Sequence, residues 1–242
     1  MSQIPKIIHC CWFGNKKIPS LNKKCMKSWE KYLPDYQIIL WNEENFDINS
    51  VLFTKQAYYA QKYAFVTDYV RIYVLYYYGG IYLDTDVEII RNIDHFLKYA
   101  AFTGFENEKA IPTGIIGAKP YHPWIERILD DYNNRAFIKE NGEYDLTTNV
   151  KIITQISIED YGLKPNNSYQ ILKDDVAIFP NDYFCPKSGP YGKIIKTNNT
   201  YAIHHFAGSW VPLKKKITLA LYNYLGEDNY NYLRKLKKTL LK

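Results

Sequence analysis

Two carboxylates set one residue apart are the part of this chain whose residue types and spacing point most directly to chemistry. Asp84 and Asp86 come directly after the apolar run 81–83, which is typical of a short strand. At a strand end, residues i and i+2 face the same side, so both carboxylates can point at one ion. Hard cations such as Mn²⁺ and Mg²⁺ take oxygen ligands and keep open positions for phosphate oxygens. The spacing predicts a divalent cation held against a diphosphate, although a solvated acidic turn would show the same spacing.

A second charged pair lies on the helical segment that leads into this strand. Asp68 and Arg71 are three residues apart and therefore share a helix face, on a stripe that is otherwise apolar. Charged groups on a largely buried stripe must be paired with each other or bound to something polar. The alternatives are a structural ion pair that braces the helix and a pair of side chains that hydrogen-bond sugar hydroxyls. The position just ahead of Asp84 favours the second.

Residues 204–210 bring two imidazoles, a small-residue turn, a hydroxyl and an indole within one short segment. Imidazole is an acceptable ligand for Mn²⁺, and the Ser209 hydroxyl could add an oxygen ligand or bind phosphate. Adjacent histidines cannot face the same way in an extended segment, so at most one is a ligand. The pattern His-x-x-Gly brings the backbone close to the ion, which favours His205 over His204. A histidine that is merely satisfied within the core is the alternative.

Two further positions are weaker candidates. Trp12 follows the first predicted strand and could stack on a nucleobase, with Gly14 allowing close approach, or it could simply belong to the core. Asn149 could reach the reacting centre from a later segment.

Alternating strands and helices must position these residues. Apolar patterns predict strands at 4–11, 37–41, 81–83, 100–105, 114–118 and 176–179, and helices at 19–33, 51–78 and 123–133, with Gly79-Gly80 ending the second helix. This order predicts an α/β, Rossmann-like sheet, and in such sheets ligands gather beyond the carboxyl ends of the strands. Asp84 and Trp12 follow two such ends.

The composition of the 242 residues is that of a globular protein, with 47% hydrophobic residues. Four cysteines without metal-type spacing favour a reducing compartment, and no run of apolar residues is long enough for a membrane span or a signal peptide. We expect a cytoplasmic protein.

The positive charge is concentrated at one end of the chain. Segment 214–242 contains eight Lys or Arg and two acidic residues, so it carries the whole net charge of +6. A uniformly basic nucleic-acid binder would not have this distribution. We expect a catalytic domain over 1–213 and a basic helical tail over 214–242, which either lies on an anionic membrane surface or packs on the domain with its lysines outward.

These residues also occur together in a known arrangement. The opening Ile4-Pro5-Lys6-Ile7-Ile8-His9-x-x-Trp12-x-Gly14 resembles that of glycosyltransferase family 32. The block Ala64-x-x-x-Asp68-x-x-Arg71-x-x-x-Leu75-x-x-x-Gly79-Gly80-x-Tyr82-x-Asp84-x-Asp86 resembles the central motif of that family, and the ending His-His-x-x-x-Ser-Trp also fits. The resemblance extends from Ile4 to Trp210, and the family is related to glucosylating toxins and to family 8 transferases.

The resemblance implies a GT-A fold with a mixed central sheet, a nucleotide-diphosphate sugar donor, Mn²⁺ or Mg²⁺, and retention of anomeric configuration. By analogy with the toxins, Asp68 and Arg71 would hold the donor sugar, and Asp84 would contact ribose or sugar. Asp86 would bind the metal, and His205 would take the third ligand position, as in family 8. The implied donor-binding residues are His9, Trp12, Asp68, Arg71, Asp84, Ser209 and Trp210; the catalytic residues are Asp68, Arg71, Asp84, Asp86 and Asn149; the metal ligands are Asp84, Asp86 and His205.

The expected activity is hexose transfer, with a UDP-sugar donor favoured over a GDP-sugar. The expected acceptor is a saccharide, lipid-linked, in bacterial capsule or lipopolysaccharide synthesis at the inner face of the membrane. Segment 106–123 would line the acceptor side. Two other classes stay open: a non-catalytic sugar-nucleotide-binding module and a metal-dependent phosphate-ester hydrolase. The hydrolase usually needs a second metal or a nucleophile, and the sequence offers neither near Asp84.

Overall fold

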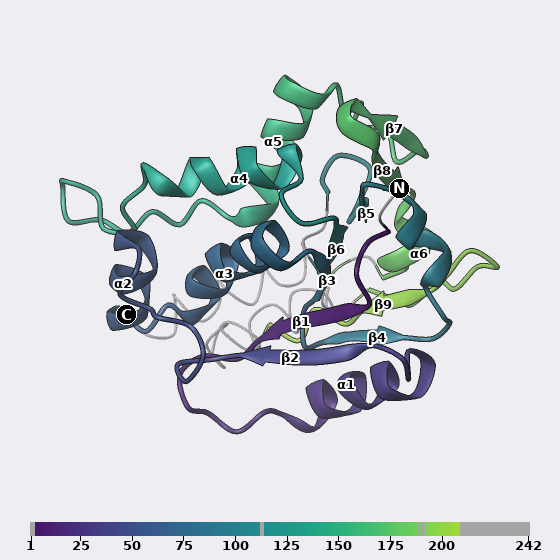
Figure 1. The fold of residues 1–242 in the computed structure, drawn as a ribbon, viewed down its shortest axis with the longest axis horizontal. Coiled ribbons are helices and arrows are strands. Elements are labelled where there is room, and N and C mark those ends of the chain that lie inside the picture. Colours follow the sequence, from purple (N-terminus) through teal and green to yellow (C-terminus); the bar gives the residue numbers. More distant parts are fainter. Residues whose placement is uncertain (1–2, 112–113, 188, 190–191, 209–242) are drawn as a thin grey trace, which may run out of the picture.

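A seven-stranded mixed sheet forms the centre of the protein, with strand order β2-β1-β3-β6-β5-β8-β7 (Figure 1). Strands β2, β1 and β3 are parallel to one another, as are β5 and β8, whereas β6 and β7 run antiparallel to their neighbours. The strands are β1 Ile7–Cys11, β2 Gln37–Trp41, β3 Gly80–Leu83, β5 Ala101–Gly104, β6 Ile115–Ala118, β7 Gln170–Leu172 and β8 Val176–Phe179. The expected α/β class and mixed central sheet are confirmed.

The computed structural model describes residues 3–111, 114–187, 189 and 192–208. Ser209, Trp210 and the basic segment 214–242 lie outside the described residues. Within the described part, no helix combines the length and the apolar character needed to cross a bilayer.

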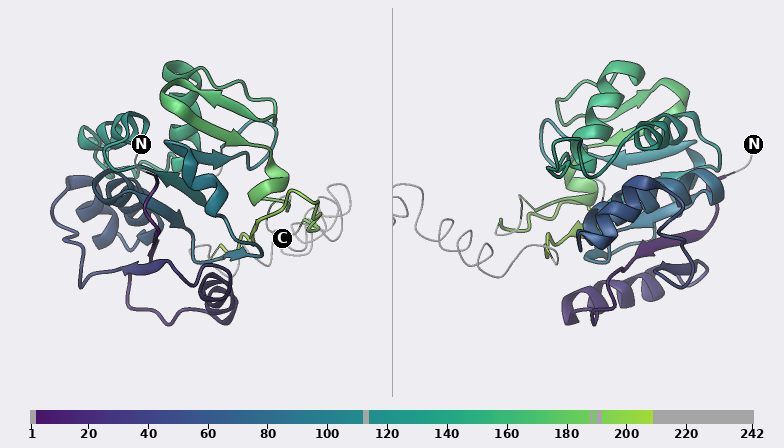
Figure 2. Two further views of the ribbon diagram at one scale, coloured as in Figure 1. Left: turned by 45° about the vertical axis from the view of Figure 1, so that its right-hand side comes forward. Right: turned by 90° about the vertical axis from the view of Figure 1, so that its left-hand side faces the viewer.

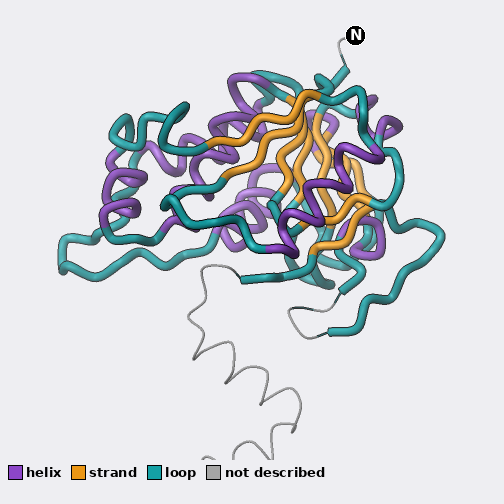
Figure 3. Tube along the Cα trace, turned by 90° about the horizontal axis from the view of Figure 1, so that it is seen from below, coloured by secondary structure: helices purple, strands orange, loops and turns teal. Residues whose placement is uncertain are grey.

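Helices cover both faces of the sheet, as Figure 3 shows with the strands in the middle. Residues of β3 alternate between the two cores that result. Tyr82 belongs to the core that includes Leu75 of α3, whereas Ile81 and Leu83 belong to the core that includes Trp29 of α1. The helices are α1 Ser20–Tyr32, α2 Leu52–Tyr59, α3 Tyr63–Tyr78, α4 Pro123–Asn133, α5 Asn149–Tyr161 and α6 Asn181–Phe184, with short 3₁₀ helices at Asp94–Lys98 and Lys173–Asp175.

A separate two-stranded sheet pairs β4 (Val87–Ile89) with β9 (Ala202–His204) in antiparallel register, and Val87 lies opposite His204. Helix α1 packs along β4. Figure 2 shows α1 and the β7–β8 hairpin at opposite ends of the molecule, with β4 on the α1 side. The small sheet therefore joins the chain just after Asp86 to a segment more than a hundred residues later.

The predicted elements are largely present, with one correction. The helix expected over 51–78 is two helices, because the chain breaks at 60–62, where Gln61 adopts a positive φ of 57°. The α3 helix ends at Gly79, as predicted. The sequence patterns did not indicate β4, α5, β7, α6 or β9.

Candidate active site

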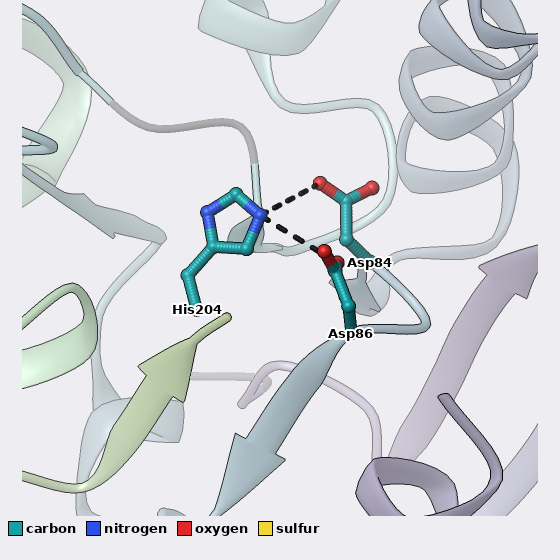
Figure 4. A group of neighbouring side chains, drawn as sticks. All are labelled: Asp84, Asp86 and His204. Carbon is teal, nitrogen blue, oxygen red and sulfur yellow. Dashed lines mark ion pairs between the residues drawn. The ribbon is translucent and has the colours of Figure 1, made fainter. Parts of the chain in front are cut away.

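Asp84, Asp86 and His204 converge at the junction of the two sheets (Figure 4). His204 Nε2 lies 3.5 Å from Asp86 Oδ1 and 4.0 Å from Asp84 Oδ2, and one ligand atom from each residue lies within 4.8 Å of the other two. Asp84 follows β3, Asp86 precedes β4, and His204 ends β9. Two carboxylate oxygens and one imidazole nitrogen suit Mn²⁺, and the carboxylates also suit Mg²⁺, so the residues present fit a divalent cation.

The electrostatics of this group fit a bound positive charge. Burial alone would raise the pKa of Asp86, but the hydrogen bond and charge of His204 and the Ala207 N–H lower it to about 2. Burial likewise disfavours the charged form of His204, but Asp86, Cys185 and Asp84 raise its pKa well above the usual value. The two carboxylates therefore favour a positive charge at this position.

The structure brings His204, and not His205, to the two aspartates. The His205 ring points to β4, where its Nε2 lies 2.8 Å from Glu88 Oε2. In the β4–β9 pairing, His204 lies opposite Val87. Neighbouring residues of an extended chain face opposite sides, so His205 faces away from the aspartates when His204 faces them. The His205 backbone N–H still donates to the Asp86 carbonyl at 3.0 Å, so the residue braces the site from outside.

Arg71 links the predicted sugar-binding residues to the first aspartate. Its Nη2 lies 3.3 Å from Asp68 Oδ1 and 3.2 Å from Asp84 Oδ1, and its guanidinium stacks 4.6 Å from the centre of the Tyr82 ring. The Tyr82 hydroxyl donates to Asp84 Oδ1 at 2.9 Å. Asp84 is therefore held from the α3 side by a guanidinium and a phenol, while its other oxygen faces His204.

Asn149 contacts Asp68 at the start of α5. Its side-chain amide donates to the Asp68 carbonyl at 2.9 Å. Burial raises the pKa of the Asp68 carboxyl to about 6, against the opposing effects of Arg71 and of a hydrogen bond from the Asn149 backbone. The structure thus places Asp68, Arg71, Asp84 and Asn149 in one connected cluster beside Asp86.

Both ring nitrogens of His9 are engaged within the protein, so the ring is not available to bind a sugar-nucleotide donor. The side chain is fully buried, Nδ1 accepts from the Trp41 indole at 3.0 Å, and Nε2 donates to the Gly79 carbonyl at 2.8 Å. Trp12 is partly exposed, and its indole N–H donates to the Lys16 carbonyl at 2.6 Å. The expected donor contacts of Ser209 and Trp210 fall outside the described residues.

The sequence analysis missed residues whose role depends on tertiary structure. Glu106 follows β5, is mostly buried, and has its pKa raised by burial, with the charges of His204 and Asp84 acting on it in opposite directions. Thr85, between the two aspartates, accepts a hydrogen bond from buried Asn22 of α1 at 2.8 Å. Glu106 begins the segment 106–123 that was expected to line the acceptor side but was not singled out within it, and no sequence signal indicated Asn22.

Comparisons with known proteins match the part of the chain that carries most of these residues. The model of the family described as a glycosyltransferase sugar-binding region containing a DXD motif matches residues 19–103, which include Asp68, Arg71, Asp84 and Asp86. Inositol phosphoceramide mannosyltransferase 3 of Schizosaccharomyces pombe is 32% identical over 140 residues, which are 55% of this chain and 38% of that protein. This chain therefore spans well under half the length of that relative.

A viral protein matches over more of its length. The uncharacterized glycosyltransferase L373 of Acanthamoeba polyphaga mimivirus is 28% identical over 225 residues, covering 86% of this chain and 84% of that protein. Among solved structures, PaToxG Glycosyltransferase has a TM-score of 0.48 and 21% identity over 66% of this chain and 71% of its own. A glycosyltransferase involved in glycosylation of the major capsid of PBCV-1 has a TM-score of 0.43 and 13% identity, with coverages of 83% and 93%.

Proposed function

We propose that this chain is a glycosyltransferase of the DXD-containing kind that its similarity to the family model and to the viral protein indicates, and that it moves a hexose from a nucleotide-diphosphate donor to a saccharide acceptor. The observation that supports this most strongly is the convergence of Asp84, Asp86 and His204 beside the Asp68–Arg71 pair. We further propose Asp84, Asp86 and His204 as the ligands of a divalent cation, with His204 taking the place first assigned to His205.

In this proposal one group of side chains binds the donor sugar and another holds the cation that contacts the diphosphate. Asp68 and Arg71 hydrogen-bond hydroxyls of the donor sugar, and Asn149 keeps Asp68 in place through its two contacts. Arg71 and Tyr82 fix the orientation of Asp84. A divalent cation held at this site would neutralise the negative charge that develops on the leaving diphosphate.

We propose that the reaction retains anomeric configuration. The acceptor hydroxyl attacks the anomeric carbon from the face that the diphosphate leaves, and its proton passes to a diphosphate oxygen. No protein base is then required, which agrees with the pairing of Asp84 and Asp86 with Arg71 and His204. We assign Glu106, on which the charges of His204 and Asp84 act, to the acceptor side of the site.

The donor is a UDP-hexose by the resemblance to the toxins, and the names of the yeast relatives add mannose to the sugars to be tested. The acceptor is a lipid-linked saccharide, and bacterial capsule or lipopolysaccharide synthesis is the proposed setting. In that setting the protein is cytoplasmic and the basic segment 214–242 binds the anionic inner membrane surface.

The deciding experiment measures donor hydrolysis over a panel of UDP- and GDP-sugars, including GDP-mannose, with Mn²⁺, Mg²⁺ or EDTA. We expect slow, metal-dependent release of sugar from one donor. Donor binding without turnover would instead support a non-catalytic binding module, and cleavage of simple phosphate esters would support a hydrolase.

The variant Asp86→Asn tests the metal assignment. It keeps an oxygen that can accept the Ala207 N–H at 2.7 Å, but it removes the charge that faces His204. We expect loss of metal-dependent turnover with a normal circular dichroism spectrum. Asp160→Asn, which removes one partner of the exposed Arg127–Asp160 pair on α4 and α5, is the matched control and should keep full activity. Turnover by Asp86→Asn at the wild-type rate would contradict the assignment.

A further inference from the structure

Helix α1 lies along the segment that carries the second aspartate, and the two are joined by side-chain hydrogen bonds. Asn22 Nδ2 donates to Thr85 Oγ1 at 2.8 Å, the Trp29 indole donates to the Val87 carbonyl at 2.7 Å, and the Ile89 N–H donates to Ser28 Oγ at 2.9 Å. Figures 1 and 2 show the helix beside β4.

The order of these bonds shows that α1 lies beside both the turn and the strand. Asn22, in the first turn of α1, contacts the turn at Thr85, and Ser28 and Trp29, about 10 Å further along the helix, contact β4. The first turn of α1 therefore meets the turn between the aspartates, and its later turns meet β4.

Thr85 is the residue between Asp84 and Asp86, and both neighbours are fixed by other parts of the fold. The Asp84 N–H donates to the Gly114 carbonyl at 2.9 Å, and the Asp86 carbonyl and carboxylate accept from His205 and Ala207. Within the described residues, the hydrogen bond from Asn22 is the contact that fixes the Thr85 hydroxyl. The bond from α1 therefore adds a further restraint on this turn, at the residue between the two carboxylates.

The burial of Asn22 supports a positioning role over a packing role. The residue is only 2% exposed, yet its Oδ1 makes no hydrogen bond in the described part of the chain. A buried amide with one unused polar atom lowers stability compared with an apolar residue of similar size. Packing alone would therefore be better served by Leu, whereas the link to Thr85 requires a donor.

We propose that Asn22 is a positioning residue for the metal site: through Thr85 it holds the carboxylates of Asp84 and Asp86 at the spacing that a divalent cation requires. The inference rests on the proposed metal site and adds a residue from a different element. Outer groups of this kind typically alter metal affinity by about 10- to 100-fold when they are removed.

The test measures binding of Mn²⁺ alone, by electron paramagnetic resonance of the free ion, together with the melting temperature. We expect Asn22→Leu and Thr85→Val each to weaken Mn²⁺ binding by about tenfold or more. The double variant should be no weaker than either single variant, because both remove the same bond. Thr85→Ser keeps the hydroxyl and should bind Mn²⁺ like the wild type.

Ser28→Ala is the matched control, since it removes a hydrogen bond from the same helix to β4 three residues beyond Asp86. It should lower the melting temperature and leave Mn²⁺ affinity unchanged. If Asn22→Leu binds Mn²⁺ as tightly as the wild type, or if Ser28→Ala weakens binding equally, the inference is wrong and the proposed function stands. If the wild type binds no Mn²⁺, both the metal assignment and this inference are wrong.

Discussion

At the residue scale, His9 illustrates how burial fixes both the tautomer and the charge of a side chain. The Trp41 indole donates to Nδ1, so the ring proton is on Nε2 and is donated to the Gly79 carbonyl. Burial lowers the pKa of His9 to about 4, although the Gly79 hydrogen bond acts in the opposite direction. The neutral ring joins β1, β2 and the end of α3, which are the elements that lead to the site.

This shift predicts a pH dependence of stability. Below its ordinary pKa of 6.5, the unfolded chain takes up a proton that folded His9 does not bind. The contribution of His9 to the free energy of unfolding is therefore fully present above pH 6.5. It decreases by about 2 to 3 kcal/mol as the pH falls toward 4. Denaturant unfolding at pH 7 and pH 4.5 checks this. His9→Gln should be less stable at pH 7 but should show a shallower slope, and an unchanged slope would contradict the shift.

The site residues differ in how far the sequence could predict them. The position of Asp84 and Asp86 after a strand and the i, i+3 spacing of Asp68 and Arg71 are local features, and the structure places all four together. The choice between His204 and His205 depends on which one lies opposite Val87, a pairing across 117 residues that no local pattern contains.

At the element scale, the junction between α3 and β3 depends on two glycines with positive φ. Gly80 has a φ of 100°, and a Cβ at that position would lie 2.6 Å from the Ile7 carbonyl oxygen. This close approach lets β3 pair with β1 immediately after the helix ends. The junction thus sets the point at which the chain reaches Asp84.

We expect Gly80→Ala to lower the free energy of unfolding by clearly more than the strain of a positive φ, which is of order 1–3 kcal/mol. The excess comes from the clash with backbone of β1, which cannot move aside easily. Gly142→Ala is the control, because Gly142 has a φ of 81° with nothing within 4 Å of the added Cβ. Equal losses in denaturant unfolding for the two variants would contradict this account.

Long, strongly patterned elements were predictable and short ones were not. β1, β2, α1 and α4 have clear periodic apolar patterns or sharp ends. β4 and β9 have three residues each and exist as strands only because they pair with each other. Helix α5 has polar residues throughout its length, and its burial against α4 comes from tertiary packing that its own periodicity barely indicates.

At the scale of the whole molecule, the described residues and the basic end of the chain have separate roles in the proposal. Deletion of residues 214–242 removes the whole net charge of +6. We expect the truncated protein to sediment far less with liposomes of anionic lipid and to hydrolyse soluble donor as before. Liposomes of zwitterionic lipid provide the control. Undiminished binding to the anionic liposomes would assign membrane contact to another surface.

The pairing of β4 with β9 has a consequence for the order in which the Asp84, Asp86 and His204 group is assembled. Asp86 accepts its hydrogen bond from Ala207, 121 residues further along the chain. A nascent chain emerging from the ribosome carries both aspartates long before the imidazole that completes the group. Local opening of β9 in the finished protein would separate both His204 and the Ala207 N–H from Asp86 in a single step.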